Sequence, residues 1–266
     1  MEENKILAYI SRVPAALALE RLAEIELHCR KQFDSPVLDL GCGDGIFAGL
    51  MFTESVDTGM DIDPVELERA RNSGNYKQLI LAPGDSVPLP ENSFSTVFSN
   101  SVLEHIPEIE PVLREVLRLL KPGGNFYCTV PSDKFEHYSC INNLLTRFGM
   151  DRSARKYRKF YNRFWKHYHC YSVDQWQALA ERCGFEVKEC FSYNSAGMCL
   201  LNDLLAPCGA MGIINKKLFN RWTLLPKIRY AVFYPLAGLI KKILISHAGK
   251  TARGGLVYLH LSPKAS

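Results

Sequence analysis

Acidic residues are missing from the C-terminal part of this 266-residue chain, because no Asp or Glu follows Asp203. The segment 204–266 carries ten basic side chains, so a whole-chain charge of +4 conceals a sum of −6 over the first 203 residues. The ten are Lys216, Lys217, Arg221, Lys227, Arg229, Lys241, Lys242, Lys250, Arg253 and Lys264. Such one-sided charge excludes an evenly mixed surface and favours contact with an anionic partner.

Metal-binding and phosphate-binding signatures are also missing. The nine cysteines include no C-x-x-C pair and no regular framework, which argues against a zinc site or a disulfide scaffold and favours reduced thiols. No Gly-Lys-Ser/Thr follows the glycines near residue 41, which excludes a P-loop. The first residues, Met1–Lys5, are too polar for a signal peptide. We therefore expect a cytoplasmic protein without a bound metal.

Apolar runs long enough to span a membrane are not expected either, since the uncharged stretch Tyr230–Ile240 has eleven residues where a spanning helix needs ~20. Trp222, Tyr230 and Tyr234 stand among the basic residues, a pattern typical of helices that lie at an anionic membrane surface. This predicts a peripheral protein at the inner face of a membrane. An ordinary helical subdomain, packed on the sheet or on a second subunit, is the open alternative. Nucleic acid is not expected, because aliphatic runs suit it poorly and no recognition motif is present.

A glycine-rich turn is the most informative feature that the chain does contain. The apolar run that starts at Val37 leads into Gly41, Gly43 and Gly45, at alternate positions and directly after Asp39. Glycine lets the main chain turn sharply and approach a ligand closely. A buried strand, a glycine turn and a helix build a nucleotide-type pocket at the carboxyl end of a parallel strand.

Further motifs follow in a fixed order. Gly59–Pro64 ends a second strand in carboxylates, Gly84-Asp85-Ser86 follows a third, and Asn92–Asn100 forms a fourth before Leu103-Glu104-His105. Leu120–Gly124 then leads into a fifth strand. The glycines have the spacing G-x-G-x-G, which differs from the G-x-G-x-x-G of dinucleotide enzymes. Through these motifs and their order, residues 36–192 resemble the class I S-adenosylmethionine-dependent methyltransferases, in their small-molecule type 11 branch.

The resemblance implies S-adenosylmethionine as cofactor and S-adenosylhomocysteine as product. It places Asp39 near the methionine ammonium of the cofactor, and Gly41, Cys42 and Gly43 along its amino-acid half. Asn100, at the end of the fourth strand, would border the methyl-transfer pocket.

The same resemblance assigns the nucleoside half of the cofactor. Asp61 would hold the ribose hydroxyls and Ile62 would flank the adenine. Asp85 would accept from the adenine amino group, and Ser86 would supply a nearby backbone group. The chain departs from the family at Asp63, where Ser or Thr is common. Two carboxylates therefore stand near the ribose position, and we assign the role to Asp61 because it follows Gly59.

The expected architecture is an α/β Rossmann-like methyltransferase sheet, mostly parallel with an antiparallel last strand. Residues 132–172 are rich in basic and aromatic side chains and predict a helical lid. A methyltransferase domain is expected over residues 1–192 plus 255–266. Residues 193–254 would form a basic, apolar helical insertion before the last strand. The sequence does not indicate an oligomeric state.

Histidines are the candidates for acid–base chemistry. His167, His169 and His137 lie in or next to the predicted lid, and imidazole can take a proton from a hydroxyl near neutral pH. A packing or hydrogen-bonding role is the alternative for each, and His105 is expected to be structural. A His/Cys metal site is possible on composition alone, from His137, Cys140, His167, His169 and Cys170, but the family rarely needs one.

The acceptor is expected to be a small molecule or a lipid-linked molecule near the membrane surface, methylated on oxygen. Carbon and nitrogen acceptors on a soluble metabolite remain open. A NAD-dependent oxidoreductase and a non-catalytic binding protein of the same fold are the alternatives from other classes. The glycine spacing argues against the first, and the presence of Asp39, Asp61 and Asp85 argues against the second.

Overall fold

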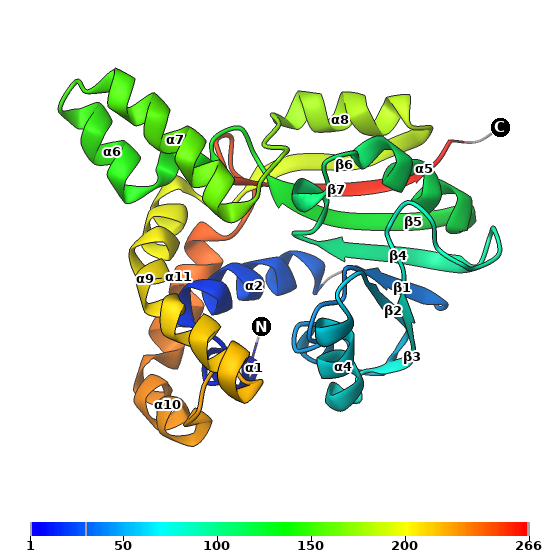
Figure 1. Ribbon diagram of the computed structural model, residues 1–266, viewed down its shortest axis with the longest axis horizontal. Helices are drawn as coiled ribbons and strands as arrows, with labels where there is room; N and C mark the ends of the chain where they lie inside the picture. Colours follow the sequence, from blue (N-terminus) through cyan, green and yellow to red (C-terminus); the bar gives the residue numbers. More distant parts are fainter. Residues whose placement is uncertain (1, 30, 265–266) are drawn as a thin grey trace. The chain divides into compact units, whose positions relative to one another are not determined.

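The computed structural model describes residues 2–29 and 31–264, which divide into two compact units (Figure 1). Unit 1 comprises residues 1–31, 135–158 and 193–255, and unit 2 comprises residues 32–134, 159–192 and 256–266. The later junctions fall close to the expected 192/193 and 254/255. The structure differs from the expected division in the N-terminal residues and in residues 135–158, which belong with the insertion and not with the sheet.

Unit 2 is built on a seven-stranded sheet in the order β3-β2-β1-β4-β5-β7-β6. The strands are β1 (Val37–Leu40), β2 (Val56–Asp61), β3 (Tyr76–Leu81), β4 (Phe94–Asn100), β5 (Leu120–Pro131), β6 (Phe185–Tyr193) and β7 (Leu256–Pro263). Strands β1 to β5 pair in parallel, and β7 runs antiparallel to β5, which confirms the predicted sheet.

The order of the strands explains where a ligand can bind. All four residues of β1 are buried, as a central strand covered on both faces requires. The chain passes from β1 outward to β2 and β3 and then returns to place β4 on the other side of β1. Such a reversal opens a crevice at the carboxyl ends of the strands, where open α/β sheets bind their ligands.

Helices of unit 2 cover the sheet through apolar stripes. They are α3 (Ala48–Met51), α4 (Pro64–Ser73), η1 (Leu103–His105), α5 (Ile109–Leu119) and α8 (Val173–Arg182). In α5 the buried residues Ile109, Val112, Val116 and Leu119 recur at helical spacing and join the core. Trp176 of α8 is buried and donates from Nε1 to the Pro131 carbonyl at 3.0 Å, which fixes α8 against the end of β5.

Unit 1 is helical. It contains α1 (Glu3–Ile10), α2 (Ala15–His28), η2 (Phe135–Tyr138), α6 (Cys140–Arg147), α9 (Ala196–Phe219), α10 (Pro226–Phe233), η3 (Tyr234–Leu236) and α11 (Ala237–His247). Arg229 of α10 donates to the carbonyls of Ile10 and Val13 at 2.8 and 2.9 Å. Asp203 of α9 accepts from the Cys140 amide at 2.8 Å. These bonds join segments that are far apart in the sequence into one helical body.

The predicted lid is not a single structural part. Helix α7 (Asp151–Trp165) crosses the junction at residues 158/159, so its first half belongs to unit 1 and its second half to unit 2. Helix α6 belongs wholly to unit 1, whereas residues 166–172 belong to unit 2. The charged and aromatic composition of residues 132–172 indicated exposed helices correctly, but it could not show that they are shared between two bodies.

Helix α9 overturns the expectation that every apolar run is too short to span a membrane. It has 24 residues, and its most apolar window has a mean hydropathy of 1.5 with 22% of it buried. By length and composition this helix could cross a membrane. Asp203 and Pro207 interrupt the apolar run in the sequence, and both lie inside the helix.

Candidate functional site

The glycine turn after β1 is held to the end of β2 by main-chain bonds. The amides of Gly41 and Cys42 both donate to the Met60 carbonyl, at 2.8 and 2.9 Å. Gly41, Gly43 and Gly45 have φ angles of +80°, +53° and +75°, a region that side chains disfavour. The predicted tight turn at the carboxyl end of the first strand is therefore present.

Two of these glycines differ in what surrounds them. A Cβ on Gly41 would lie 2.4 Å from Val102, so this position is closed by packing. A Cβ on Gly43 would meet nothing within 4 Å. The bare main chain at Gly43 thus faces open space, which is the kind of cradle that a closely approaching cofactor needs.

Asp61 is fixed at the same turn. Its Oδ2 accepts from the Gly43 amide at 2.9 Å, and its Oδ1 accepts from the Asp63 amide at 2.9 Å. Each carboxylate oxygen has a second lone pair, so both can still accept from two neighbouring hydroxyls. Asp63 instead caps α4, because its Oδ1 accepts from the Val65 amide at 2.8 Å. Because Asp63 caps a helix while Asp61 lies at the glycine turn, the structure supports the assignment of the ribose to Asp61.

Exposed apolar side chains lie next to Asp61. Ile62 is 71% exposed directly after β2, and Leu81 is 57% exposed at the end of β3. Asp85 and Ser86 follow β3 and are also exposed. An aromatic base could cover the two apolar side chains while its polar edge meets Asp85 or Ser86. The roles of these residues remain predictions.

Asp39 is buried behind the glycine turn. Its carboxylate is 4% exposed and accepts from the Tyr76 hydroxyl at 2.7 Å. Burial raises the pKa of Asp39 to about 7, against the opposing effect of the Tyr76 hydrogen bond and with a smaller contribution from Asp61. Asp39 thus forms part of the wall behind the turn, and direct contact with an ammonium stays a prediction.

The end of β4 lies beside the end of β1 at the same edge of the sheet. Asn100 Oδ1 accepts from the Thr129 hydroxyl at 2.8 Å, and the buried Ser99 hydroxyl donates to the Leu40 carbonyl at 3.0 Å. These bonds tie β4 to its neighbours β5 and β1. Asn100 therefore stands at the carboxyl edge of the sheet, where the sequence placed it.

Residues 166–171 pass over the loop that follows β4. The Tyr168 amide donates to the Glu104 carbonyl at 2.8 Å. His169 Nε2 lies 2.9 and 3.1 Å from the carbonyls of Ile106 and Pro107, and its Nδ1 lies 2.7 Å from the Tyr171 hydroxyl. Because carbonyls only accept, Nε2 carries a proton and donates to them, while Nδ1 is hydrogen-bonded to the Tyr171 hydroxyl. Both ring nitrogens of His169 are thus engaged, which favours a positioning role over the predicted role as a base.

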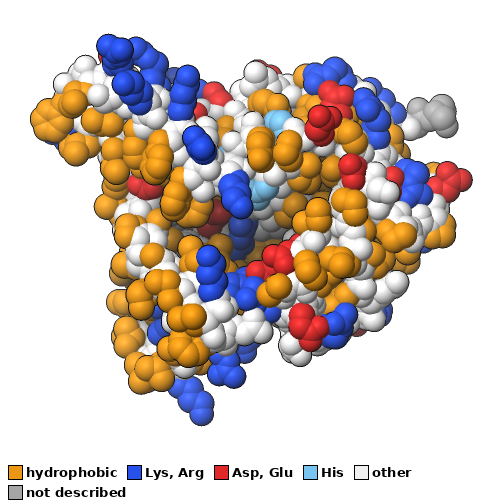
Figure 2. All heavy atoms as spheres, in the orientation of Figure 1, with side chains coloured by type: hydrophobic (Ala, Val, Ile, Leu, Met, Phe, Trp, Pro, Cys, Tyr) orange, Lys and Arg blue, Asp and Glu red, His pale blue; other side chains and the backbone are white. Residues whose placement is uncertain are grey.

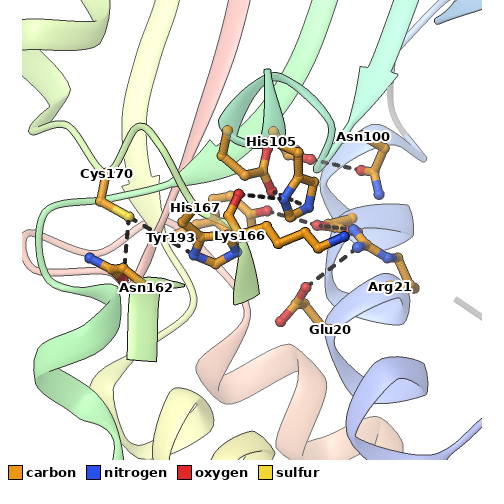
Figure 3. A network of polar contacts seen from close by, with 12 residues as sticks. Glu20, Arg21, Asn100, His105, Asn162, Lys166, His167, Cys170 and Tyr193 are labelled. Atoms are coloured by element: carbon orange, nitrogen blue, oxygen red, sulfur yellow. Dashed lines mark hydrogen bonds and ion pairs between the residues drawn. The ribbon is translucent and has the colours of Figure 1, made fainter. Parts of the chain in front are cut away.

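The other two candidate histidines belong to different units. His137 lies in η2 of unit 1. His167 lies beside His105, with ring centroids 5.2 Å apart, and its Nδ1 is 4.0 Å from Cys170 Sγ (Figure 3). Burial, with a smaller effect from His105, lowers the pKa of His167 to about 4. His167 is therefore neutral near pH 7 but a weak base.

The sequence assigned no chemistry to Glu104 and predicted a structural role for His105, and the structure brings both together with His167. Glu104 is 3% exposed, and its carboxylate approaches both His105 and His167. The signal available in the sequence was the position of the Leu103-Glu104-His105 run, directly after the predicted acceptor end of β4. Nothing in the sequence indicated that His167 joins them, because that contact depends on how residues 166–171 return to the sheet.

The open glycine turn, the fixed carboxylate after β2 and the exposed apolar side chains fit a nucleoside-bearing cofactor and define the class I methyltransferase type of Rossmann-like domain. Residues 38–128 match the family model described as a methyltransferase domain. Residues 38–128 therefore form a methyltransferase domain of the kind that uses S-adenosylmethionine.

Curated relatives share this part of the chain. The sterol 24-C-methyltransferase of Neurospora crassa is 37% identical over 101 residues, which cover 35% of this chain and 27% of that protein. The ubiquinone biosynthesis O-methyltransferase of Pectobacterium carotovorum is 35% identical over 120 residues, covering 41% of this chain and 49% of that protein. The chain thus matches about a quarter to a half of the length of these relatives.

Solved structures agree on the fold. A methyltransferase from Thermotoga maritima has a TM-score of 0.57 at 16% identity, covering 94% of this chain and 91% of that one. The 4+2 cyclase SpnF also has a TM-score of 0.57, at 18% identity, covering 94% and 82%. Because one of the two is named for a different reaction, likeness at this level shows the fold alone.

Proposed function

We propose that the protein transfers a methyl group from S-adenosylmethionine to an acceptor at the carboxyl edge of β4. The observation that carries this proposal is the pairing of the open main chain at Gly43 with the Asp61 carboxylate that it holds. When bound, the cofactor supplies a methyl group that is already activated on sulfur. The protein then has to bind, orient and exclude water, since alignment supplies much of the rate.

Each side of the crevice has its part in this proposal. The main chain of Gly41–Gly43 binds the amino-acid half of the cofactor, and Asp61 accepts from both ribose hydroxyls. Ile62 covers one face of the adenine. Asn100, held by Thr129, borders the acceptor. His169 holds residues 166–171 against the loop after β4 and so shapes that border.

The acceptor that we favour is a lipid or a lipid-linked molecule, methylated on oxygen. Two relatives are named for a sterol and for ubiquinone biosynthesis, which agrees with an apolar acceptor. Unit 1 offers the surface that such an acceptor needs. Its large exposed apolar side chains include Leu204, Met211, Ile213, Ile214, Leu218, Phe219, Leu224, Leu225, Ile228, Val232, Tyr234, Leu236, Leu239 and Ile245.

This exposed apolar surface also supports attachment to a membrane. Figure 2 shows hydrophobic side chains gathered over α9 and α10, with basic side chains among them. Soluble monomers rarely expose so much apolar area in one region. We infer that the helices of unit 1 lie at an anionic membrane surface and make the protein peripheral on its cytoplasmic side.

Cofactor binding is tested by calorimetry with S-adenosylhomocysteine on the wild type and on Asp61→Ala. Loss of charge-assisted hydrogen bonds should cost roughly 1.5–3 kcal/mol per bond, so affinity should fall at least about tenfold. Asp63→Ala is the matched control, because Asp63 caps α4 and should affect stability more than affinity. Unchanged affinity in Asp61→Ala, or tighter binding of NAD than of S-adenosylhomocysteine by the wild type, would overturn the proposal.

A further inference from the structure

Three potential metal ligands meet just after β4. One ligand atom each of Glu104, His105 and His167 lies within 4.8 Å of the other two. All three residues belong to unit 2. Two hydrogen bonds join their segments: the Tyr168 amide donates to the Glu104 carbonyl, and His105 Nδ1 lies 3.2 Å from the Lys166 carbonyl.

The orientation of His105 suits a ligand. Because the Lys166 carbonyl can only accept, Nδ1 donates to it, and Nε2 is then the ring nitrogen that would bind a metal ion. Nε2 is also the atom that faces Glu104, 3.8 Å from Oε1. A metal-bound histidine almost always donates its other N–H to a carbonyl or carboxylate in this way, which fixes the tautomer.

The distances agree with a site that has to contract slightly around an ion. Metal–nitrogen and metal–oxygen bonds of about 2.0–2.2 Å put neighbouring ligand atoms roughly 3–3.5 Å apart. The observed 3.8 Å between His105 Nε2 and Glu104 Oε1 is close to this range, and a ring nitrogen of His167 lies within 4.8 Å of a ligand atom of each. Glu104 is buried, whereas the His105 side chain is 44% exposed, so one side of the cluster is open to water and to an acceptor.

We propose that Glu104, His105 and His167 bind a divalent transition-metal ion, a site that the sequence analysis did not expect. Two imidazoles and one carboxylate suit Zn²⁺, Fe²⁺ or Co²⁺, whereas Mg²⁺ and Ca²⁺ prefer sites made of oxygen ligands alone. Three protein ligands leave positions for exchangeable molecules, as catalytic sites require.

The chemistry that we assign to the ion follows from its position after β4. This assignment rests on the proposed methyl transfer. The cluster begins four residues after Asn100, at the acceptor side of the sheet. A hydroxyl oxygen bound to the ion releases its proton to water more readily, because the cation stabilises the alkoxide. The alkoxide oxygen then forms the bond to the methyl carbon while the carbon–sulfur bond breaks, and the sulfonium becomes the neutral thioether of S-adenosylhomocysteine.

Binding is tested without any methyl acceptor, using tag-free full-length protein and Co²⁺ as the probe, with Zn²⁺ as competitor. The expected result is one Co²⁺ per chain with visible absorption bands that Zn²⁺ abolishes. Glu104→Gln and His105→Asn should each weaken Co²⁺ binding by at least about 10–100-fold. Replacing a residue that only hydrogen-bonds to a metal ligand already lowers metal affinity by this factor, and replacing the ligand itself should cost at least as much. His247→Asn is the matched control, since His247 is an exposed histidine of unit 1. Cys170→Ser should also leave binding unchanged, which excludes thiolate coordination by the neighbour of His167.

Several outcomes would overturn the site: no stoichiometric binding by the wild type, equal binding by Glu104→Gln and His105→Asn, or loss of binding in His247→Asn. Because His105 is exposed, its variant is expected to fold, and circular dichroism verifies this. Calorimetry with S-adenosylhomocysteine separates the two proposals. Cofactor binding without metal binding rejects the metal site and leaves the methyltransferase proposal standing. Metal binding without cofactor binding supports the metal site and rejects the methyltransferase proposal.

Discussion

Asp39 is a carboxylate that folding transfers from water to a pocket closed by the Tyr76 hydroxyl. Because its pKa rises to about 7 in the folded protein, ionisation is easier in the unfolded chain. The stabilisation from neutral Asp39 is therefore complete below the unfolded pKa, near 4, and is lost as the pH rises towards 7. A cationic group next to Asp39 would reverse part of this loss.

Asp39→Asn should flatten this pH dependence, since the amide cannot ionise and can still accept from Tyr76. Between pH 4 and 7 the free energy of unfolding of the wild type should fall relative to that of the variant, by on the order of 1 kcal/mol per pH unit. Urea denaturation at several pH values measures the difference. Parallel curves for the two proteins would show that Asp39 ionises at its ordinary pKa.

At the residue scale, the sequence predicted what depends on the local chain. Asp61 was preferred to Asp63 because it follows Gly59, and in the structure Asp61 ends β2 while Asp63 caps α4. Asp39 could not be placed, since its burial depends on Tyr76, which lies on another strand. Likewise, the Glu104–His105–His167 cluster forms because residues 166–171 pack on the loop after β4, and no local sequence pattern predicts that contact.

Helix α8 shows how an element is fixed by its first turn. The Ser172 hydroxyl accepts from the Gln175 amide at 3.3 Å, while the Gln175 side chain accepts from the Ser172 amide at 2.9 Å. This capping box satisfies two amides that would otherwise lack partners at the helix start. It also sets the start of the helix that carries Trp176 onto β5.

Ser172→Ala should destabilise the protein by about 1 kcal/mol, because the variant loses the cap acceptor. Ser172→Thr retains a hydroxyl and should cost less. Both are compared with the wild type by urea denaturation at constant pH. If the alanine variant is as stable as the wild type, the cap contributes nothing to the stability of this helix.

At the element scale, strand and helix periodicity predicted the sheet of unit 2 well, since buried strands and amphipathic helices differ in their repeat. The parts shared between the units were harder. Periodicity indicates that α7 is a helix, but not that its halves pack in different bodies. For α9, Asp203 and Pro207 interrupt the apolar pattern in the sequence, yet the helix continues through both, and Asp203 accepts from the Cys140 amide.

At the scale of the whole molecule, charge and apolar exposure coincide in unit 1. Lys217, Arg221 and Lys227 are exposed among exposed Leu218, Leu225 and Ile228. Each basic residue near an anionic surface contributes about 1 kcal/mol, and inserted apolar side chains add to this. Attachment by this surface should therefore depend on both lipid charge and ionic strength.

The intact protein should float with vesicles that contain anionic lipid at low salt and should be released at high salt. Replacing Lys217, Arg221 and Lys227 by Glu removes at least about 3 kcal/mol of attraction, so vesicle affinity should fall roughly 100-fold or more.

The matched control replaces Arg71, Arg114 and Arg182 of unit 2 by Glu, an equal change of net charge at positions exposed to 65%, 61% and 62%. If both triple variants lose binding equally, net charge and not the surface of unit 1 governs attachment. Protein that resists salt and alkaline carbonate would instead be inserted through α9, whose 24 residues are long enough to span. A wild type that stays in solution with anionic vesicles at low salt would contradict membrane attachment altogether.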